Sequence, residues 1–150
     1  LNNEFESDLV ARQTGIDNRL QLKLHTFFAP EGAVRSYIDP ATSLVMVRGD
    51  TLRVSEGDSI IFKGEELTIR NLMLYDQARF LRLGGQVSPD SSSELQLAVS
   101  RLDLDFVNDL VDLPFAPGGK VSVNVSLIDP LNRRRLQGVG RIDTFSLDGF

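Results

Sequence analysis

His25 is the single histidine of the chain and is therefore the first residue to test for chemistry. A metal site built from two histidines is excluded within these 150 residues, and a Ser-His-Asp triad would have to use His25. Its run alternates, with Leu20, Leu22 and Leu24 on one parity and His25 on the polar parity. That placement is typical of a histidine on the solvated face of a strand, so we assign it no catalytic role.

Carboxylates form the second candidate for chemistry. Asp103 and Asp105 flank Leu104, and a pair of carboxylates can bind calcium or transfer a proton. The same spacing fits the outward positions of a strand that runs into a helix cap. Asp109 and Asp112 follow on the expected exposed side of a short helix. We favour the structural interpretation for all four residues.

The remaining motifs also have simpler explanations than chemistry. Arg133, Arg134 and Arg135 form the one basic cluster, which could contact lipid phosphates or acidic groups of a partner, but a solvated hairpin loop explains it more simply. Gly84-Gly85 is not followed by a helical pattern and is therefore no phosphate-binding loop, and a glycosylation match at residues 124–126 lies in an expected strand. No catalytic constellation is recognisable. We predict that the chain is not an enzyme and uses neither a cofactor nor a metal.

Bulk composition narrows the classes of partner. The 150 residues are 41% hydrophobic and 25% charged, which fits one folded domain over residues 1–150. A net charge of −5 argues against a nucleic-acid partner, because phosphate binding needs a basic surface. There is no cysteine, so disulfides and thiolate chemistry are excluded. The absence of tryptophan, with two tyrosines, weakens a carbohydrate-binding interpretation.

The ends of the sequence suggest a piece of a longer protein. The chain begins at Leu1 rather than at methionine and stops at Phe150 within an alternating pattern. No apolar run reaches the ~18–20 residues that a transmembrane helix needs. We therefore expect that any membrane anchor or export signal lies outside these residues, and that membrane contact is made through such regions.

The stretch of residues 67–104 organises the predicted fold. Three apolar-alternating runs are joined by short polar or glycine-bearing connections, which predicts an antiparallel meander with one apolar face. Leu67 and Ile69 share one parity, whereas Leu72 and Leu74 share the other. This switch near Arg70-Asn71 predicts a β-bulge or a bend.

The rest of the chain predicts more strands. About nine or ten are expected in all, with the clearest period of two at residues 19–28 and 121–127 and only a weak pattern at residues 1–17. Gly138 and Gly140 leave the last strand with fewer side chains and permit the backbone of a neighbouring strand to approach closely. Residues 105–113 have helical spacing, which predicts one helix of two or three turns. Because that helix is too short to cover the sheet, the apolar face must meet another sheet, close on itself or meet a ligand.

Spaced glycines and Leu-x-Leu pairs follow one another in a recognisable order along the chain, although many other β proteins share such motifs. The segments in this order are residues 58–62, 66–74, 80–88, 95–97, 102–104, 118–123, 129–130 and 136–140. Their order resembles the repeat-rich β region of the TamB/AsmA-like translocation and assembly family. The resemblance covers about residues 50–150, whereas the first 50 residues match only as alternating strands. One departure is the basic run at residues 133–135, which follows Asp129-Pro130.

The resemblance implies both a fold and a function. Such proteins build a curled, open, U-shaped sheet with an apolar concave face. They are anchored in the inner membrane, cross the periplasm, carry phospholipids toward the outer membrane, and in some cases act with an outer-membrane barrel partner. The expected partners of this chain are thus phospholipid acyl chains. The candidate lining of the groove is Leu67, Ile69, Leu72, Leu74, Leu81, Leu83, Leu95, Leu97, Val99, Val121, Val123, Val125 and Leu127.

One other interpretation stays open at this point. Each inward-facing residue of a strand is also explained by an ordinary sealed core, as in a β-sandwich that binds or adheres at a cell surface. In that case the loops at residues 88–93 and 132–135 would bind the partner. The two folds predict different surfaces: a sandwich seals its apolar faces, whereas a trough leaves one open and tends to dimerise or to bind detergent.

Overall fold

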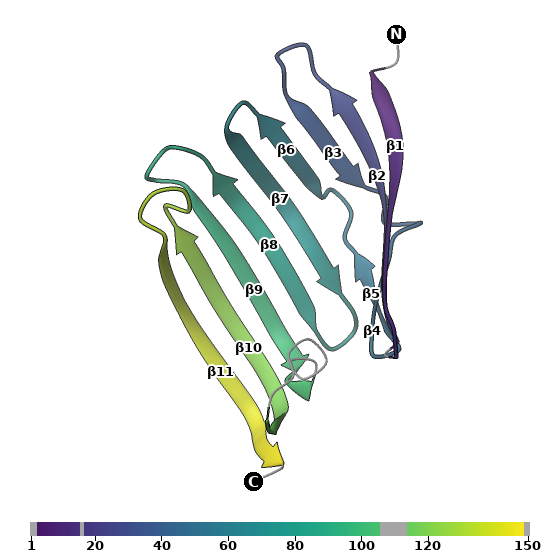
Figure 1. Ribbon diagram of the computed structural model, residues 1–150, viewed down its shortest axis with the longest axis vertical. Coiled ribbons are helices and arrows are strands. Elements are labelled where there is room, and N and C mark those ends of the chain that lie inside the picture. The colour runs from purple at the N-terminus through teal and green to yellow at the C-terminus, as the bar shows by residue number, and fades with distance from the viewer. Residues whose placement is uncertain (1–2, 16, 106–113, 149–150) are drawn as a thin grey trace.

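The computed structural model describes residues 3–15, 17–105 and 114–148, whose regular elements are all strands (Figure 1). Eleven strands form a single antiparallel sheet, rather than the two separate sheets of a sandwich. The prediction of an all-β antiparallel fold is thus confirmed. The strands are β1 (Glu4–Gln13), β2 (Asn18–Phe28), β3 (Val34–Ile38), β4 (Leu44–Val47), β5 (Asp50–Val54), β6 (Ser59–Lys63), β7 (Glu66–Tyr75), β8 (Phe80–Val87), β9 (Glu94–Asp103), β10 (Ala116–Ile128) and β11 (Arg135–Asp148).

Between β2 and β7 the sheet contains two pairs of short strands, one pair beside each end of these two long strands. One end of β2 pairs with β3 and the other end with β4, while β7 pairs in the same way with β6 and β5. Within the two pairs of short strands, β3 pairs with β6 and β4 pairs with β5. We call residues 33–63 the divided region. From β7 to β11 each strand simply pairs with the next one, and we call these five strands the meander.

Two bulges keep the apolar residues of the meander on one face. The register of β7 with β8 shifts between Ile69 and Leu72, and Asn71 has a φ of 49° there. This confirms the bulge predicted from the switch of parity near Arg70-Asn71. A second shift separates Val121 from Val123 in the β9–β10 pair, opposite Arg101, whose φ is 58°. Because each bulge adds one residue, it restores the apolar residues beyond it to the same face.

Burial is concentrated in the divided region. Among the described residues, the buried hydrophobic side chains are Ala33, Ile38, Val45, Leu52, Val54 and Val99. Five of these six lie within residues 33–63, and only Val99 belongs to the meander. The meander is therefore a sheet whose apolar side chains are mostly only half-buried.

Residues 1–17 and 105–113 are the two segments with the least regular sequence pattern. The weak pattern at residues 1–17 proves to contain β1, which pairs with β2 from Glu4 to Gln13. The short helix predicted at residues 105–113 lies almost wholly outside the described residues. Within the described part of the chain, no helix is long and apolar enough to cross a membrane.

Candidate functional site

The register of the meander aligns its apolar residues in rows across the strands. One row runs from Leu72 through Leu83 and Leu97 to Val125, because each of these residues is the Cα partner of the next. A parallel row consists of Leu74, Leu81, Val99 and Val123. Directly opposed residues of neighbouring strands project on the same side of a sheet. Strand pairing thus builds a continuous apolar surface from β7 to β10.

All thirteen residues predicted to line a groove belong to this one surface, which we call the apolar face. Leu67 and Ile69 join it through β7, Leu95 and Leu127 through the neighbouring pair β9–β10, and Val121 through the end of β10. Apart from the buried Val99, all of them are of intermediate exposure. The predicted set is thereby brought together in space. That the apolar face binds a ligand stays a prediction.

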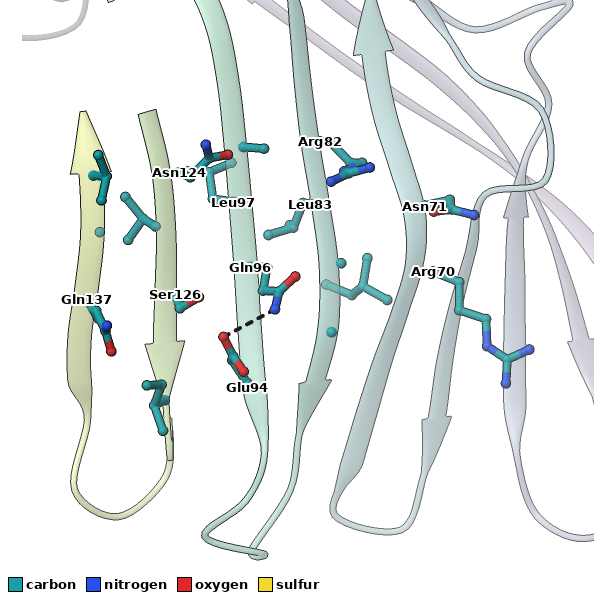
Figure 2. A pocket seen from close by; sticks show the side chains of 18 residues that line it. Arg70, Asn71, Arg82, Leu83, Glu94, Gln96, Leu97, Asn124, Ser126 and Gln137 are labelled. Carbon is teal, nitrogen blue, oxygen red and sulfur yellow. Dashed lines mark hydrogen bonds between the residues drawn. The ribbon is translucent and has the colours of Figure 1, made fainter. Parts of the chain in front are cut away.

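A hollow of about 960 Å³ lies over the meander, and most of its lining residues belong to the polar face (Figure 2). Leu83 and Leu97 of the apolar face also line it. Side chains of all five strands border it, including Arg70, Arg82, Gln96, Asn124 and Gln137. The resemblance predicted a concave apolar face, whereas this hollow is bordered mainly by polar-face positions. Alternation alone could not have located it, because curvature and twist do not follow from the period of two.

One side of the hollow carries a short polar network. The Gln96 side-chain amide donates to Glu94 Oε1 at 3.2 Å, as the dashed line in Figure 2 marks. Hydrogen bonds from the side chains of Ser126 and Gln96 hold the pKa of Glu94 below its usual value. Glu94 therefore stays ionised and presents a negative charge to the hollow at neutral pH.

Two adjacent glycines in β8 serve different purposes at the hollow. Gly85 has a φ of +121°, and a Cβ built there would collide with the carbonyl oxygen of Glu94 in β9. A Cβ on Gly84 would make only an ordinary contact, 3.6 Å from the Ile69 carbonyl oxygen. Gly85 is thus required by the close approach of β8 and β9. Gly84 has no side chain, so its own main chain lines the hollow directly.

The two loops considered for binding are clamped together at one end of the meander. The Asp129 amide donates to the Ser93 carbonyl at 2.9 Å, and the Asn132 amide side chain donates to the Pro89 carbonyl at 3.3 Å. Asp129 itself is buried, with Oδ1 accepting from Asn132 at 2.7 Å and Oδ2 from the Arg133 amide at 3.2 Å. These contacts order the loops, while the arginines at residues 133–135 remain exposed.

His25 lies among carboxylates on the polar face of β2. Its Nδ1 is 3.5 Å from an oxygen of Glu4 and 3.5 Å from an oxygen of Glu6, both in β1. Lys23 Nζ is 3.2 Å from Glu6, and this hydrogen bond raises the pKa of the lysine. These contacts explain His25 as a link between the two strands. Among the described residues, no cluster of three or more histidines and carboxylates is placed to hold a metal ion.

Asp103 and Asp105 contact different cations. Asp103 lies 3.5 Å from Arg79 Nη1 and 3.8 Å from Lys120 Nζ, whereas Asp105 lies 3.9 Å from Arg48 Nη1. These ion pairs support the structural interpretation of both carboxylates. Asp109 and Asp112 lie outside the described residues.

Arg79 is a structural residue that the sequence interpretation missed. Its Nη2 is 2.7 Å from Asp50 and its Nε is 2.7 Å from Asp76, while only 11% of the side chain is exposed. Asp50 begins β5, Asp76 follows β7 and Asp103 ends β9, so one guanidinium joins the divided region to the meander. The only signal in the sequence was the local pair Asp76…Arg79. The other partners are 29 and 24 residues away, and alternation does not predict such contacts.

The comparisons with known proteins assign neither a family nor a function to this chain. No family model, no curated protein and no solved structure matches this chain. The resemblance to the TamB/AsmA-like family therefore stays a prediction from the sequence. The features on which a function can be argued are the apolar face and the polar hollow.

Proposed function

We propose that the apolar face of the meander shields lipid acyl chains from water. The observation that carries this proposal is the register, which assembles thirteen apolar residues on one face of β7–β10 and leaves twelve of them only half-buried. A monomeric soluble domain rarely leaves a large continuous apolar patch without a partner. A face of this kind therefore needs an occupant.

Acyl chains suit such a face on energetic grounds. Moving each CH₂ group out of water is worth roughly 0.8 kcal/mol, so a chain of ordinary length gains several kcal/mol without any specific polar contact. The rows of leucine and valine offer this contact along the strands and across them. No charged or hydrogen-bonding side chain is needed for binding of this kind, and none belongs to the thirteen residues.

The cellular setting of the proposal comes from the sequence resemblance alone. In that setting the chain is a segment of a longer protein that crosses the periplasm from an inner-membrane anchor. Its curled sheet would carry phospholipids toward the outer membrane, with an outer-membrane barrel as a possible partner. The acyl-chain proposal can be tested without assuming that setting.

The test is to identify co-purifying lipid by mass spectrometry and to measure uptake of labelled phospholipid from liposomes. Two variants share one strand and one added charge: Leu97→Asp alters the apolar face, and Gln96→Asp alters the polar face. We expect Leu97→Asp to lose most of the lipid and Gln96→Asp to retain it. Circular dichroism and urea unfolding establish that both variants are folded.

The outcomes separate a lipid-binding face from an inert one. Lipid in the native chain, depleted selectively by Leu97→Asp, supports the proposal. Equal amounts of lipid in both variants would contradict the proposal. The absence of co-purifying lipid and of lipid uptake in the folded native chain would contradict it as well. If Leu97→Asp unfolds, Leu97→Ser provides a milder reduction of the same apolar surface.

A binding module is the second candidate, because the polar hollow is large enough for a small hydrophilic ligand. Arg82, Glu94, Gln96 and Asn124 bring both charges and amide groups to its border. This candidate predicts that Gln96→Asp loses binding of a polar ligand, as detected by a thermal-shift screen. Leu95→Asp is the matched variant on the apolar face, because Leu95 does not line the hollow, and it should retain the ligand.

A further inference from the structure

Within the described residues, the outer edge of β11 has no neighbouring strand. From Arg135 to Asp143 the strand pairs without interruption with β10, and no other described strand pairs with it. Three apolar side chains of this segment are strongly exposed: Leu136 at 74%, Val139 at 78% and Ile142 at 51%. A long edge with exposed apolar side chains is a template for pairing with another strand.

The segment is complementary to itself when two copies run antiparallel about Val139. In that register Arg135 of one copy faces Asp143 of the other, and Leu136 faces Ile142, each pair occurring twice. Opposed charges and opposed apolar residues both stabilise an antiparallel pair. The remaining opposed pairs are Val139 with itself, Gly138 with Gly140, and Gln137 with Arg141.

The faces of the two sheets also match in this arrangement. Leu136 and Ile142 are the Cα partners of Leu127 and Val121, so they continue the apolar face onto β11. Arg135 and Asp143 pair with Ile128 and Lys120 on the polar face. A two-fold axis perpendicular to the sheet keeps like faces on the same side. Pairing about Val139 therefore joins two apolar faces into one.

The opposite edge of the sheet is formed by β1 (Figure 1). β1 carries Glu4, Glu6 and Asp8 at alternate positions, and charged residues at an edge discourage pairing with another chain. The segment from Arg135 to Asp143 has charged residues only at its two ends and at Arg141. β1 also exposes the apolar side chains of Phe5, Leu9 and Val10, at 47%, 49% and 55%, whereas Leu136 and Val139 of β11 are exposed at 74% and 78%. By exposure of its apolar side chains, β11 is the more open edge.

We propose that β11 is a homodimerisation edge, at which a second copy of this chain adds antiparallel about Val139. The interface is isologous and closes after two copies, so it gives a dimer rather than a fibre. The two sheets become one continuous sheet with a continuous apolar face. This inference does not depend on lipid binding.

Charge reversal tests both the interface and its register. Arg135→Asp places like charges opposite each other in both ion pairs of a dimer, and so does Asp143→Arg. We expect each single variant to dimerise about ten- to a hundred-fold more weakly than the native chain, as measured by sedimentation equilibrium. An equimolar mixture of the two variants restores both ion pairs, because each chain supplies the charge that the other lacks. We expect the mixture to form heterodimers with near-native affinity.

A cysteine cross-link gives an independent measurement, and the native chain has no cysteine to interfere. Val139→Cys places two thiols at the two-fold axis, where Cα atoms about 4.5–5.5 Å apart suit a disulfide. Gln137→Cys is the control on the same face, because its copies would be about 13 Å apart. We expect rapid cross-linking at residue 139 and at least ten-fold slower cross-linking at residue 137.

The results that would overturn the proposal are specific. A native chain that stays monomeric at millimolar concentration excludes the dimer. An open-ended polymer would instead implicate β11 with β1 of the next copy. A dimer that is unaffected by either charge reversal, or that cross-links equally at residues 137 and 139, excludes the register about Val139.

Discussion

The divided region and the meander are parts of one sheet, but they treat their apolar residues differently. In the divided region Ile38, Leu52 and Val54 are at most 7% exposed. In the meander Leu83, Leu97 and Val125 point to one face and are only half-buried. Aliphatic side chains therefore form a core in one region and a surface in the other.

The difference in pairing explains how the divided region can bury more than the meander. In the divided region four short strands fit between β2 and β7. From β7 to β11 each strand pairs only with the next strand of the chain, so it covers little beyond its two neighbours. We infer that the divided region supplies most of the stability of the fold. The meander would supply the surface that is free to bind.

The largest expected effect comes from the same truncation in the two regions. Leu52→Ala removes a buried side chain and should lower the free energy of unfolding by about 2–5 kcal/mol. Leu97→Ala removes a partly exposed one and should cost about 1 kcal/mol. Urea unfolding measures both values. Equal losses would mean that the apolar face is as well packed as the divided region, and the comparison would fail.

A substitution in β8 tests whether the meander is held by close approach of its backbones. Gly85→Ala puts a Cβ against the Glu94 carbonyl at a φ that favours glycine, so we expect a loss of about 2–3 kcal/mol. Gly84→Ala is the neighbouring control, and it should be neutral or slightly stabilising. Thermal unfolding of the two variants gives the measurement. Similar melting temperatures would show that β8 and β9 can separate without cost.

Much of the meander could be predicted because its information is local. The alternation of Leu95, Leu97 and Val99 defines a strand and its apolar face, and the change of parity between Ile69 and Leu72 locates a bulge. Short hairpins then set the pairing of β8 with β9. A register known from neighbouring strands is sufficient to bring the thirteen residues together.

The divided region could not be predicted in the same way. Its pairings join β2 with β4 and β3 with β6. No turn residue specifies which short strand pairs with which end of β2. The ion pairs of Arg79 depend on those pairings, since they bring Asp50 near the turn after β7. The polar hollow depends on the curvature of the sheet, which follows from twist and bulges rather than from alternation.

Arg79 joins the two regions, and its removal should have an intermediate effect. Arg79→Met keeps the aliphatic stem but loses the ion pairs with Asp50 and Asp76, so we expect a loss of about 1–2 kcal/mol at pH 7. Arg82→Met changes an exposed arginine of β8 and serves as the control. A loss no greater than that of the control would mean that the ion pairs do not couple the regions.

The Arg79 variant should also alter the response to acid. Burial works against ionisation of Asp76, but hydrogen bonds from the Arg79 side chain and from the Ala78 and Arg79 amides outweigh it and lower its pKa. The stability that this provides is present above the unfolded pKa, about 3.9, and is lost as the pH falls through the folded value. We expect Arg79→Met to lose less stability than the native chain between pH 5 and pH 2. Parallel curves of unfolding free energy against pH would contradict this assignment.

The smallest expected effect concerns a buried carboxylate of the divided region. Asp58 is 2% exposed, and burial raises its pKa, although hydrogen bonds from Ser55 and the Met73 main chain oppose the shift. A raised folded pKa means that stability is fully present below the unfolded pKa and is lost as the pH rises through the folded value. Asp58→Asn removes the charge and should therefore gain on the order of 1 kcal/mol at pH 7, with no gain below about pH 4. Urea unfolding at the two pH values measures this difference. A variant that is less stable at pH 7 would show that the divided region needs the ionised carboxylate of Asp58 in addition to its apolar core.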